Sequence, residues 1–319
     1  MVSRILLVDG NHLARRAYFT VGKTLKTVDG QLSGVIFAAM RSLRKIAIEN
    51  ATAKMILFFD GGHTKASKLY DEYKKNKGRD RSEDFYKQCG VFEDLAEACG
   101  IKTVCVRGVE ADTLIGAATG HFVDKGFDVS IVSSDHDFYQ LVRKGVDVYD
   151  DLRGERIDRA ELRRRWPHLQ PRDFIAVKCY AGDRSDNISG LPGLGERAAL
   201  ALAEKLPFAE LCIFAKSRDA AAPDPEEFDK RLKWRIAKAF EDVRAAKALL
   251  RRNIALVRLP RKAKELDEPV RVQFTRQLDR VVNLNSAAAK GIMREYQLTS
   301  ILSQFDTWVQ PLVRAGLGV

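Results

Sequence analysis

Acidic residues follow short apolar runs in the first half of the chain and also stand in two later loops. The runs ILLV, MILFF and VSIVSS each lead directly into at least one aspartate, and the loops RGVEADTLIG and AGDRSDNISG each carry two acids. In open parallel sheets, functional side chains gather where the carboxyl ends of the strands meet. The sequence therefore predicts one crevice with eight carboxylates, namely Asp9, Asp60, Glu110, Asp112, Asp135, Asp137, Asp183 and Asp186.

Such a crevice suits divalent metal ions. Carboxylates that lie close together repel one another and are driven to protonate unless a cation relieves the repulsion. Mg²⁺ takes hard oxygen ligands, and two such ions about 4 Å apart can activate water and stabilise both oxygens of a phosphodiester during cleavage. A single aspartate after a strand is equally typical of a helix N-cap or a turn. Capping, however, does not require acids at three strand ends and in two further loops.

The elements that would position these acids follow an alternating pattern. Short β-branched runs predict strands, and the stretches between them, such as Gly34–Glu49 and Asp112–Lys125, have helical spacing. The predicted strands are Ile5–Val8, Met55–Phe59, Thr103–Val106, Val129–Val132 and Val146–Tyr149. This alternation indicates an α/β fold with a parallel sheet covered on both faces. Later helices are predicted at Pro171–Ala181, Glu196–Leu206, Glu226–Leu250 and Ala287–Gln304.

Two segments are strongly charged. Residues 63–90 are rich in Lys, Arg, Asp and Glu with few large aliphatic side chains, so we expect them to project from the core as an arch or loop. Residues 230–264 contain thirteen Lys or Arg residues against only Glu241 and Asp242, which accounts for the whole net charge of +11. This basic stripe fits a polyanionic partner, although a solvated helix face has the same composition.

Composition argues against several classes of protein. No uncharged run approaches the ~20 apolar residues that a membrane-spanning helix needs, and the N-terminal MVSRILLVDG meets an acid too early for a signal peptide. The five cysteines form no CxxC pair; they are Cys89, Cys99, Cys105, Cys179 and Cys212. Their scatter predicts reduced thiols in a cytoplasm, and neither a zinc site nor a disulfide framework.

The ordered motifs VDGNHLARRAY, FFDGG, RGVEADTLIG, SSDHDF and GDRSDNISGLPGLGERAA resemble the 5′-nuclease superfamily. That superfamily includes phage-type flap endonucleases and the 5′-nuclease domain of bacterial DNA polymerase I. The resemblance covers about residues 4–305 and implies a PIN-like α/β nuclease core over residues 1–168, with a helical arch inserted at about 63–98. Residues 169–319 would form a helical DNA-binding region. It would contain a helix-hairpin-helix (H3TH) element at about 172–206 and the basic stripe at 230–264.

The resemblance assigns the acids to two metal sites. Asp9, Asp60, Glu110 and Asp112 would serve a first Mg²⁺ ion, and Asp135, Asp137, Asp183 and Asp186 a second, with Mn²⁺ as a substitute. Some relatives have a further Asp where this chain has Thr113, which weakens the implied affinity of one site. Arg16 matches a basic residue of the family, either catalytic or part of a core salt bridge, and His12 on the same turn is structural or contacts phosphate.

The arch and the hairpin would contact DNA. In EYKKNKGRDR, the resemblance implies that Tyr73 stacks on a base and that Lys74 stabilises charge in the transition state. Lys77, also expected to serve catalysis, stands where the family commonly has Arg; Lys keeps the charge but loses the bidentate fork, which weakens the implied contact with phosphate or the transition state. Residues expected to line the passage of the 5′ strand are Lys75, Arg79 and Arg81. Residues expected on duplex DNA are Gly193, Gly195, Arg197, Lys233, Lys238, Arg244 and Lys247. In the family the hairpin also holds K⁺.

These features lead to the prediction of a monomeric, Mg²⁺-dependent 5′-3′ exonuclease and flap endonuclease that acts on DNA flaps, 5′ ends and junctions. Two alternatives remain open from the sequence. One is a structure-specific DNA-binding protein with little catalysis, although eight acids would only repel phosphate in a pure binder. The other is a 5′-nuclease directed at RNA in RNA–DNA hybrids, because a helix-hairpin-helix contacts backbone rather than bases.

Overall fold

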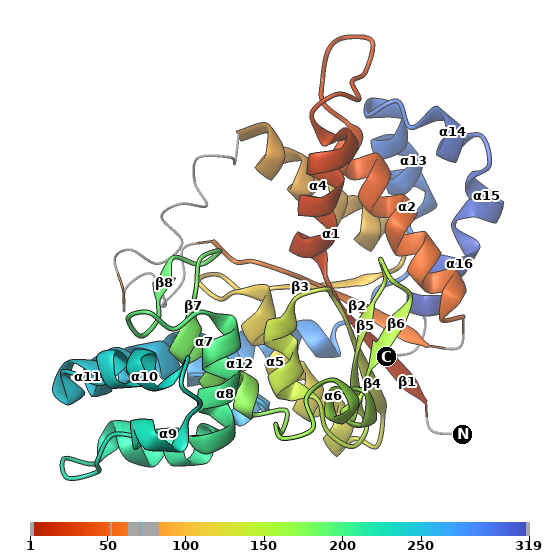
Figure 1. Cartoon of the computed structure of the whole chain (residues 1–319). Helices are drawn as coiled ribbons and strands as arrows, with labels where there is room; N and C mark the ends of the chain where they lie inside the picture. Colours follow the sequence, from red (N-terminus) through yellow and green to blue (C-terminus); the bar gives the residue numbers. More distant parts are fainter. Residues whose placement is uncertain (1–2, 52, 63–69, 71–82, 317–319) are drawn as a thin grey trace.

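A six-stranded sheet forms the centre of the computed structural model, which describes residues 3–51, 53–62, 70 and 83–316 (Figure 1). The strands are β1 Arg4–Asp9, β2 Lys54–Phe59, β3 Lys102–Cys105, β4 Asp128–Val132, β5 Val146–Asp150 and β6 Glu155–Ile157. Their order is β3-β2-β1-β4-β5-β6; β1 to β5 are parallel, and β6 runs antiparallel to β5. The predicted parallel α/β sheet is confirmed.

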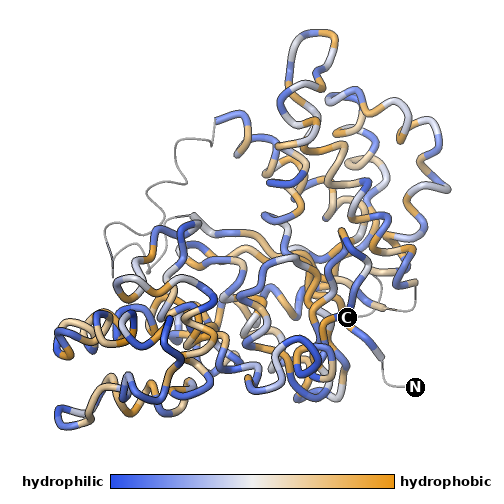
Figure 2. The backbone as a smooth tube through the Cα atoms, in the orientation of Figure 1, coloured by the Kyte–Doolittle hydropathy of each residue, from blue (hydrophilic) through white to orange (hydrophobic). Residues whose placement is uncertain are grey.

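The central strands are mostly apolar because helices cover both faces of the sheet. On β1, Leu6 and Val8 lie in one hydrophobic cluster, whereas Ile5 and Leu7 lie in another. This alternation follows from the two-residue repeat of a strand, which sends successive side chains to opposite faces. Figure 2 shows the hydrophobic residues concentrated along these strands. A parallel sheet of this kind reads in sequence as nearly continuous hydrophobic runs.

Helices from both ends of the chain form the layer on one face. It consists of α1 Gly10–Ala17, η1 Tyr18–Gly22, α2 Gly34–Glu49, α4 Glu83–Ala98, α13 Ser286–Glu295, α14 Thr299–Leu302, α15 Phe305–Trp308 and α16 Gln310–Gly316. The opposite face is covered by α5 Ala111–Asp124, η3 His136–Leu141, α6 Arg159–Arg165 and α12 Glu268–Asp279. Among the described residues, no helix is both long and apolar enough to span a bilayer.

A separate hydrophobic cluster organises the helical region beside the sheet (Figure 1). Its elements are α7 Asp173–Ala181, α8 Glu196–Lys205, α9 Phe208–Lys216, α10 Lys233–Ala239 and α11 Val243–Val257. A short ribbon, β7 Gly182–Asp183 and β8 Ile188–Ser189, lies between α7 and α8, and η4 Pro225–Glu227 and η5 Ala263–Glu265 are single turns. Buried Gln140 connects this region to the sheet. Its side-chain amide accepts a hydrogen bond from Leu259 N and donates to Val257 O and Asp137 O.

The packing corrects three predicted boundaries. The predicted arch ends too late, because residues 83–98 form α4, whose Phe85, Cys89 and Phe92 are buried in the core. The predicted helix over 226–250 is interrupted, since the Asp242 carboxylate caps a new helix, α11, at Ala245 N. The C-terminal helices α12 to α16 pack on the sheet layers and not on the helical region, so residues 169–319 do not form one unit.

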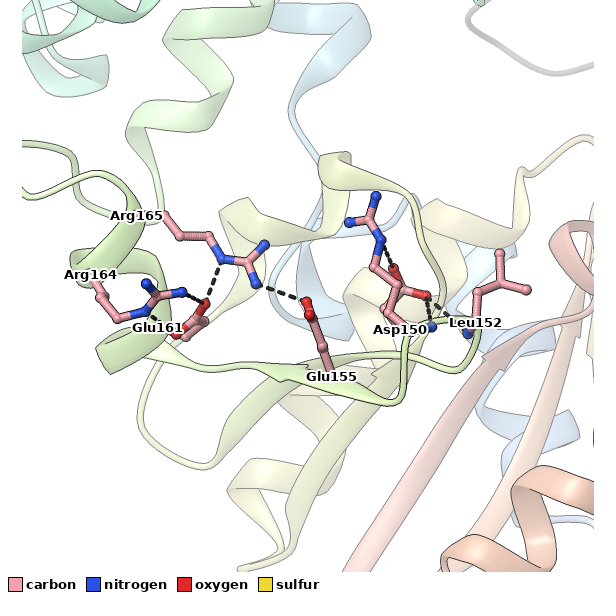
Figure 3. A network of polar contacts seen from close by, with 7 residues as sticks. Asp150, Leu152, Glu155, Glu161, Arg164 and Arg165 are labelled. Carbon is pink, nitrogen blue, oxygen red and sulfur yellow. Dashed lines mark hydrogen bonds and ion pairs between the residues drawn. The ribbon is translucent and has the colours of Figure 1, made fainter.

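A polar network secures the sheet edge near the end of β5. Figure 3 shows Glu161 between Arg164 and Arg165, and Arg165 reaching Glu155 on β6. The neighbouring Asp150 carboxylate accepts hydrogen bonds from the backbone of Leu152 and Arg153, which shapes the turn after β5. This turn carries Asp151, which is buried and pairs with Arg16 of α1.

A pocket of about 420 Å³ lies between α4, β3 and α12. Its lining residues are Glu93, Glu97, Thr103, Cys105, Gln273, Arg276, Gln277 and Arg280. The side-chain amide of Gln277 accepts a hydrogen bond from Cys105 N and donates one to Cys105 O, which joins α12 to the edge strand β3. Burial raises the pKa of Glu93 from 4.5 to about 7, and Asp94 and Glu97 add to the rise.

This raised pKa predicts that Glu93→Gln stabilises the protein at alkaline pH. Between pH 4.5 and about 7 the folded state binds more protons at Glu93 than the unfolded state does, so stability falls as pH rises through this window. The variant lacks that loss and should have a higher free energy of unfolding than the parent at pH 8, with little difference at pH 4.5. Urea denaturation at both pH values measures this. A difference that is the same at both would contradict the prediction.

Candidate active site

The first group of acids lies where β1, β2 and α5 meet. Asp9 ends β1 and caps α1, because its Oδ1 accepts a hydrogen bond from His12 N at 2.9 Å. Asp60 follows β2, and its Oδ1 accepts from Ala111 N, at the start of α5, at 3.0 Å. Buried Glu110 is the residue directly before α5, and Asp112 lies in its first turn. Strand ends and a helix start thus bring these four acids to one edge of the sheet, as the sequence predicts.

Arg15 of α1 enters this group. Its Nη2 lies 3.6 Å from Asp60 Oδ2, with the Arg15 side chain 38% exposed. Burial by itself would lower the pKa of Arg15, but nearby carboxylates raise it above its ordinary value; they belong to Asp60, Asp9, Asp186 and Asp135. Burial also raises the pKa of Asp9, whereas the charges of His12 and Arg15 oppose that rise. A single guanidinium therefore balances acids from both predicted metal sites.

The second group of acids surrounds Lys178 of α7. Asp135 caps η3 through a 2.9 Å hydrogen bond from Asp137 N. Lys178 Nζ lies 2.7 Å from Asp137 Oδ1 and 2.7 Å from Asp183 Oδ2. Asp183 Oδ1 accepts from the backbone N–H of Ser185 and Asp186 in the turn between β7 and β8. The helical region thus delivers Lys178 and the Asp183 loop to the acids at the end of β4.

The two carboxylates at Lys178 differ electrostatically. Burial raises the pKa of Asp137 to about 7, and Asp135 adds to the rise against the charge of Lys178. Burial acts on Asp183 as well, but Lys178 and the Ser185 N–H outweigh it and lower the pKa of Asp183 to about 2. The Lys178–Asp183 contact has hydrogen-bond geometry, whereas Lys178–Asp137 is an ion pair. Buried Asp137 Oδ1 accepts no hydrogen bond from the residues that the structure describes.

These acids gather around cations of the protein itself. In the described ranges, no three His, Cys, Asp or Glu side chains are arranged as they stand to hold one metal ion. Their donor set is nonetheless hard oxygen, and the buried Asp137 Oδ1 already lies beside a cation, the Lys178 ammonium, so these residues fit a divalent ion. Sequence reasoning missed both Arg15 and Lys178. A usable signal for Lys178 was its place five residues before Asp183, on the helix that leads into the acid loop.

Arg16 has a different partner from Arg15. It makes a bidentate pair with buried Asp151, at 3.0 and 2.7 Å. This geometry agrees with the core salt bridge, the second role that the sequence left open for Arg16, and leaves its guanidinium committed to the turn after β5. The ring Nε2 of His12 lies 3.1 Å from Ser134 Oγ, so His12 joins α1 to the segment after β4.

The candidate DNA-binding residues lie on the helical region. Gly193 has φ +77° and an open space where a Cβ would stand, and Gly195 is the exposed residue before α8. Exposed side chains include those of Arg197, Lys238 and Arg244.

Two lysines of the basic stripe have protein partners. Lys233 pairs with Glu226. Lys247 does not suit contact with DNA: it is buried, and its ammonium donates to the carbonyls of Arg218 and Ala220 and lies over the Phe214 ring. Its prediction as a DNA-binding residue is wrong, because it connects α11 to the segment after α9. The predicted arch residues lie outside the described residues; they are Tyr73, Lys74, Lys75, Lys77, Arg79 and Arg81.

Comparisons with known proteins place the chain in a family. It is 28% identical over 302 residues to the thermostable DNA polymerase I of Thermus filiformis, covering 95% of this chain but only 33% of the relative. It is 30% identical over 203 residues to a 5′-3′ exonuclease of Buchnera aphidicola, covering 63% of this chain and 70% of that one. The chain therefore spans about one third of the polymerase and most of the separate exonuclease.

Solved structures share the fold at low identity. The bacteriophage T5 D15 flap endonuclease, solved in a complex with DNA and metal ions, matches with a TM-score of 0.61 at 19% identity, covering 92% of this chain and 99% of that one. Residues 4–167, just over half of the chain, match the model described as the 5′-3′ exonuclease, N-terminal resolvase-like domain. The chain accordingly belongs to the 5′-3′ exonuclease family.

Proposed function

We propose that this chain is a divalent-metal-dependent, structure-specific 5′-nuclease that hydrolyses DNA phosphodiesters at 5′ ends, flaps and junctions. The observation that carries the proposal is the pair of acid groups at the sheet edge, each balanced by an internal cation, Arg15 or Lys178. A surface that only bound DNA would gain nothing from carboxylates that repel phosphate. A site that takes metal ions needs them.

The positions of the acids assign them to two different metal ions. Asp9, Asp60, Glu110 and Asp112 would hold one ion of the Mg²⁺ class, and Asp135, Asp137, Asp183 and Asp186 a second. When bound, such ions supply an activated water and stabilise the attacking and leaving oxygens. The backbone N–H groups of His12, Ala111 and Asp137 each fix one carboxylate oxygen, which orients the other. This preorganisation spares the site the cost of ordering several carboxylates when it binds ions.

The helical region would hold the duplex beside these acids. Backbone N–H groups at the Gly193–Gly195 loop and the N-terminus of α8 can approach a phosphate closely, since neither glycine carries a Cβ. The same helical region supplies Lys178 and the Asp183 loop to the acids. A phosphate held at α8 is thereby linked to the acid groups through one packed unit.

A single assay tests the proposal. End-labelled flap, nicked duplex, single-stranded and RNA–DNA hybrid substrates are incubated with Mg²⁺, with Mn²⁺ or with EDTA, and the products are sized on a gel. We expect cleavage near the junction of the DNA flap and at 5′ ends, in both metals and not in EDTA. Binding without cleavage would establish a DNA-binding protein instead, and cleavage confined to the hybrid would establish an RNA-directed nuclease.

A further prediction concerns the basic stripe, corrected for buried Lys247. Replacing Lys233, Lys238 and Arg244 together by Gln should weaken binding to every duplex-containing substrate. It should also flatten the slope of log K against log salt by up to about 0.9 for each phosphate that is no longer neutralised. Because Lys233 is already paired with Glu226, we expect it to contribute least. Salt titrations of duplex binding in Ca²⁺ measure both effects.

The matched control removes three cations elsewhere on the surface. They are exposed residues of α2 and of the turn after α5, namely Arg41, Lys45 and Lys125. Their replacement by Gln changes the net charge equally, so an equal change in slope in both triple variants would assign the effect to overall charge and not to the stripe.

A further inference from the structure

Two adjacent arginines of α1 have different partners. Arg16 makes two short contacts, 3.0 and 2.7 Å, with the buried carboxylate of Asp151. Arg15 makes one longer contact, 3.6 Å, with Asp60, and its side chain is 38% exposed compared with 20% for Arg16. Charge-assisted bidentate pairs are the strong ones. The Arg15 contact is therefore the weaker of the two and the easier to exchange.

Arg15 contacts the Asp60 oxygen that does not accept the hydrogen bond from Ala111 N. Asp60 Oδ1 is engaged by Ala111 N, whereas Oδ2 faces the guanidinium. The charge of Arg15 also acts on Asp9, Asp186 and Asp135, which come from three other chain positions. Its location at the meeting of the two acid groups gives it an electrostatic role that Lys178 does not have. Within the described part of the chain, the ion pairs of Lys178 are with Asp137 and Asp183, both of the second group.

We propose that Arg15 is a resident counter-cation of the acid crevice, which holds the Asp60 carboxylate in place without metal and must leave Asp60 Oδ2 before a divalent ion binds there. The proposal rests on the metal-dependent function proposed above. A positive charge close to the ion lowers its affinity, because the two cations repel each other and a partly enclosed site screens that repulsion less than bulk water does. Arg15 therefore sets how much divalent metal the crevice needs, and is a positioning residue for the acids.

The first test measures metal binding and not cleavage. The full-length Arg15→Gln variant, Arg15→Lys and the parent are titrated with Mn²⁺ at low salt, and free Mn²⁺ is followed by electron paramagnetic resonance. We expect Arg15→Gln to bind the tightest ion about fivefold or more tightly than the parent, and Arg15→Lys to stay within about twofold. The control Arg41→Gln removes the same charge from exposed α2 and should leave the affinity unchanged. Unchanged or weaker binding by Arg15→Gln would overturn the proposal.

A second test in EDTA separates this inference from the proposed function. Arg15→Gln should lower the melting temperature of the metal-free protein, and the loss should be clearly smaller in an Asp60→Asn background, because the Arg15–Asp60 pair is then already broken. Equal losses in both backgrounds would show that Arg15 does not act through Asp60 and would overturn the proposal. If the parent itself bound no Mn²⁺, the proposed metal-dependent function would fail, while this double-mutant cycle would still decide the role of Arg15.

Discussion

Replacing Asp135 by Asn is expected to lower single-turnover cleavage more than about a hundredfold, a barrier increase of at least about 2.7 kcal/mol, while the fold and DNA binding persist. Asp135 Oδ1 accepts the hydrogen bond of Asp137 N that begins η3. Asn is as good an N-cap as Asp, so the substitution retains this bond and removes only the negative charge. Any large loss then reports on the charge, which the proposed function assigns to metal binding.

Asp158→Asn is the matched control for this prediction. Asp158 caps α6 by accepting from Glu161 N at 2.8 Å, and it lies on the exposed surface near the sheet edge. The chemical change and the local role are the same, but the site is different, so cleavage should be unaffected. Flap binding is compared in Ca²⁺ and melting temperature in EDTA. An Asp135→Asn variant within about tenfold of the parent rate would show that Asp135 is only a helix cap.

The sheet and the placement of the acids at its edge were predictable because each depends on local sequence. A strand buried on both faces is nearly continuously apolar, and the chain has five short, mostly apolar runs at the five parallel strands. Asp9 and Asp60 directly follow two of them and Asp135 comes three residues after the end of a third, so their convergence follows from the parallel topology. No assumption about distant packing is needed for these three residues.

The partners of the acids could not be predicted in the same way. Arg15 and Arg16 are neighbours in sequence, and only the packing of α1 decides which one meets Asp60 and which one meets Asp151. Lys178 reaches Asp137 because α7, from a separate hydrophobic cluster, docks beside η3. Such contacts between distant segments leave no periodic signal in the sequence.

The sequence did contain an indication that Lys247 is buried, but the basic composition of residues 230–264 led to the opposite prediction. It precedes Leu250 and Ile254 by three and seven residues, the spacing of one helix face. That face packs inward in α11, and Lys247 is buried with it. Its ammonium group donates to two carbonyl oxygens and lies over the Phe214 ring.

For the C-terminal helices, the sequence predicts packing but not the partner. Their amphipathic pattern predicts that they pack, but does not state on which layer.

The second large effect is expected for Gly61→Ala, which should disrupt the connection between Asp60 and α5. A Cβ at Gly61 would lie 1.8 Å from the carbonyl oxygen of Val106 and 2.5 Å from its carbonyl carbon. Backbone on both sides fixes this close approach, since Gly61 N donates to Val109 O and Gly108 N donates to Gly61 O, each at 2.8 Å. The two segments must separate to admit a methyl group. Because backbone atoms cannot rotate aside, we expect a loss of about 3 kcal/mol, the upper end of the range for overpacking.

That separation should also impair the site in molecules that remain folded. Asp60 is the residue before Gly61, and the loop from Val106 to Val109 leads into Glu110, so moving them apart lengthens the Asp60–Ala111 hydrogen bond, now 3.0 Å. We therefore expect weaker Mn²⁺ binding and slower cleavage, together with the lower unfolding free energy in urea. Gly90→Ala is the control: Gly90 lies inside α4 with no neighbouring atom within 4 Å of its Cβ position, and alanine there should stabilise the helix by about 0.5–1 kcal/mol. If Gly61→Ala had the same stability and metal affinity as the parent, the Val106 segment would be free to move and would not hold Asp60 in place.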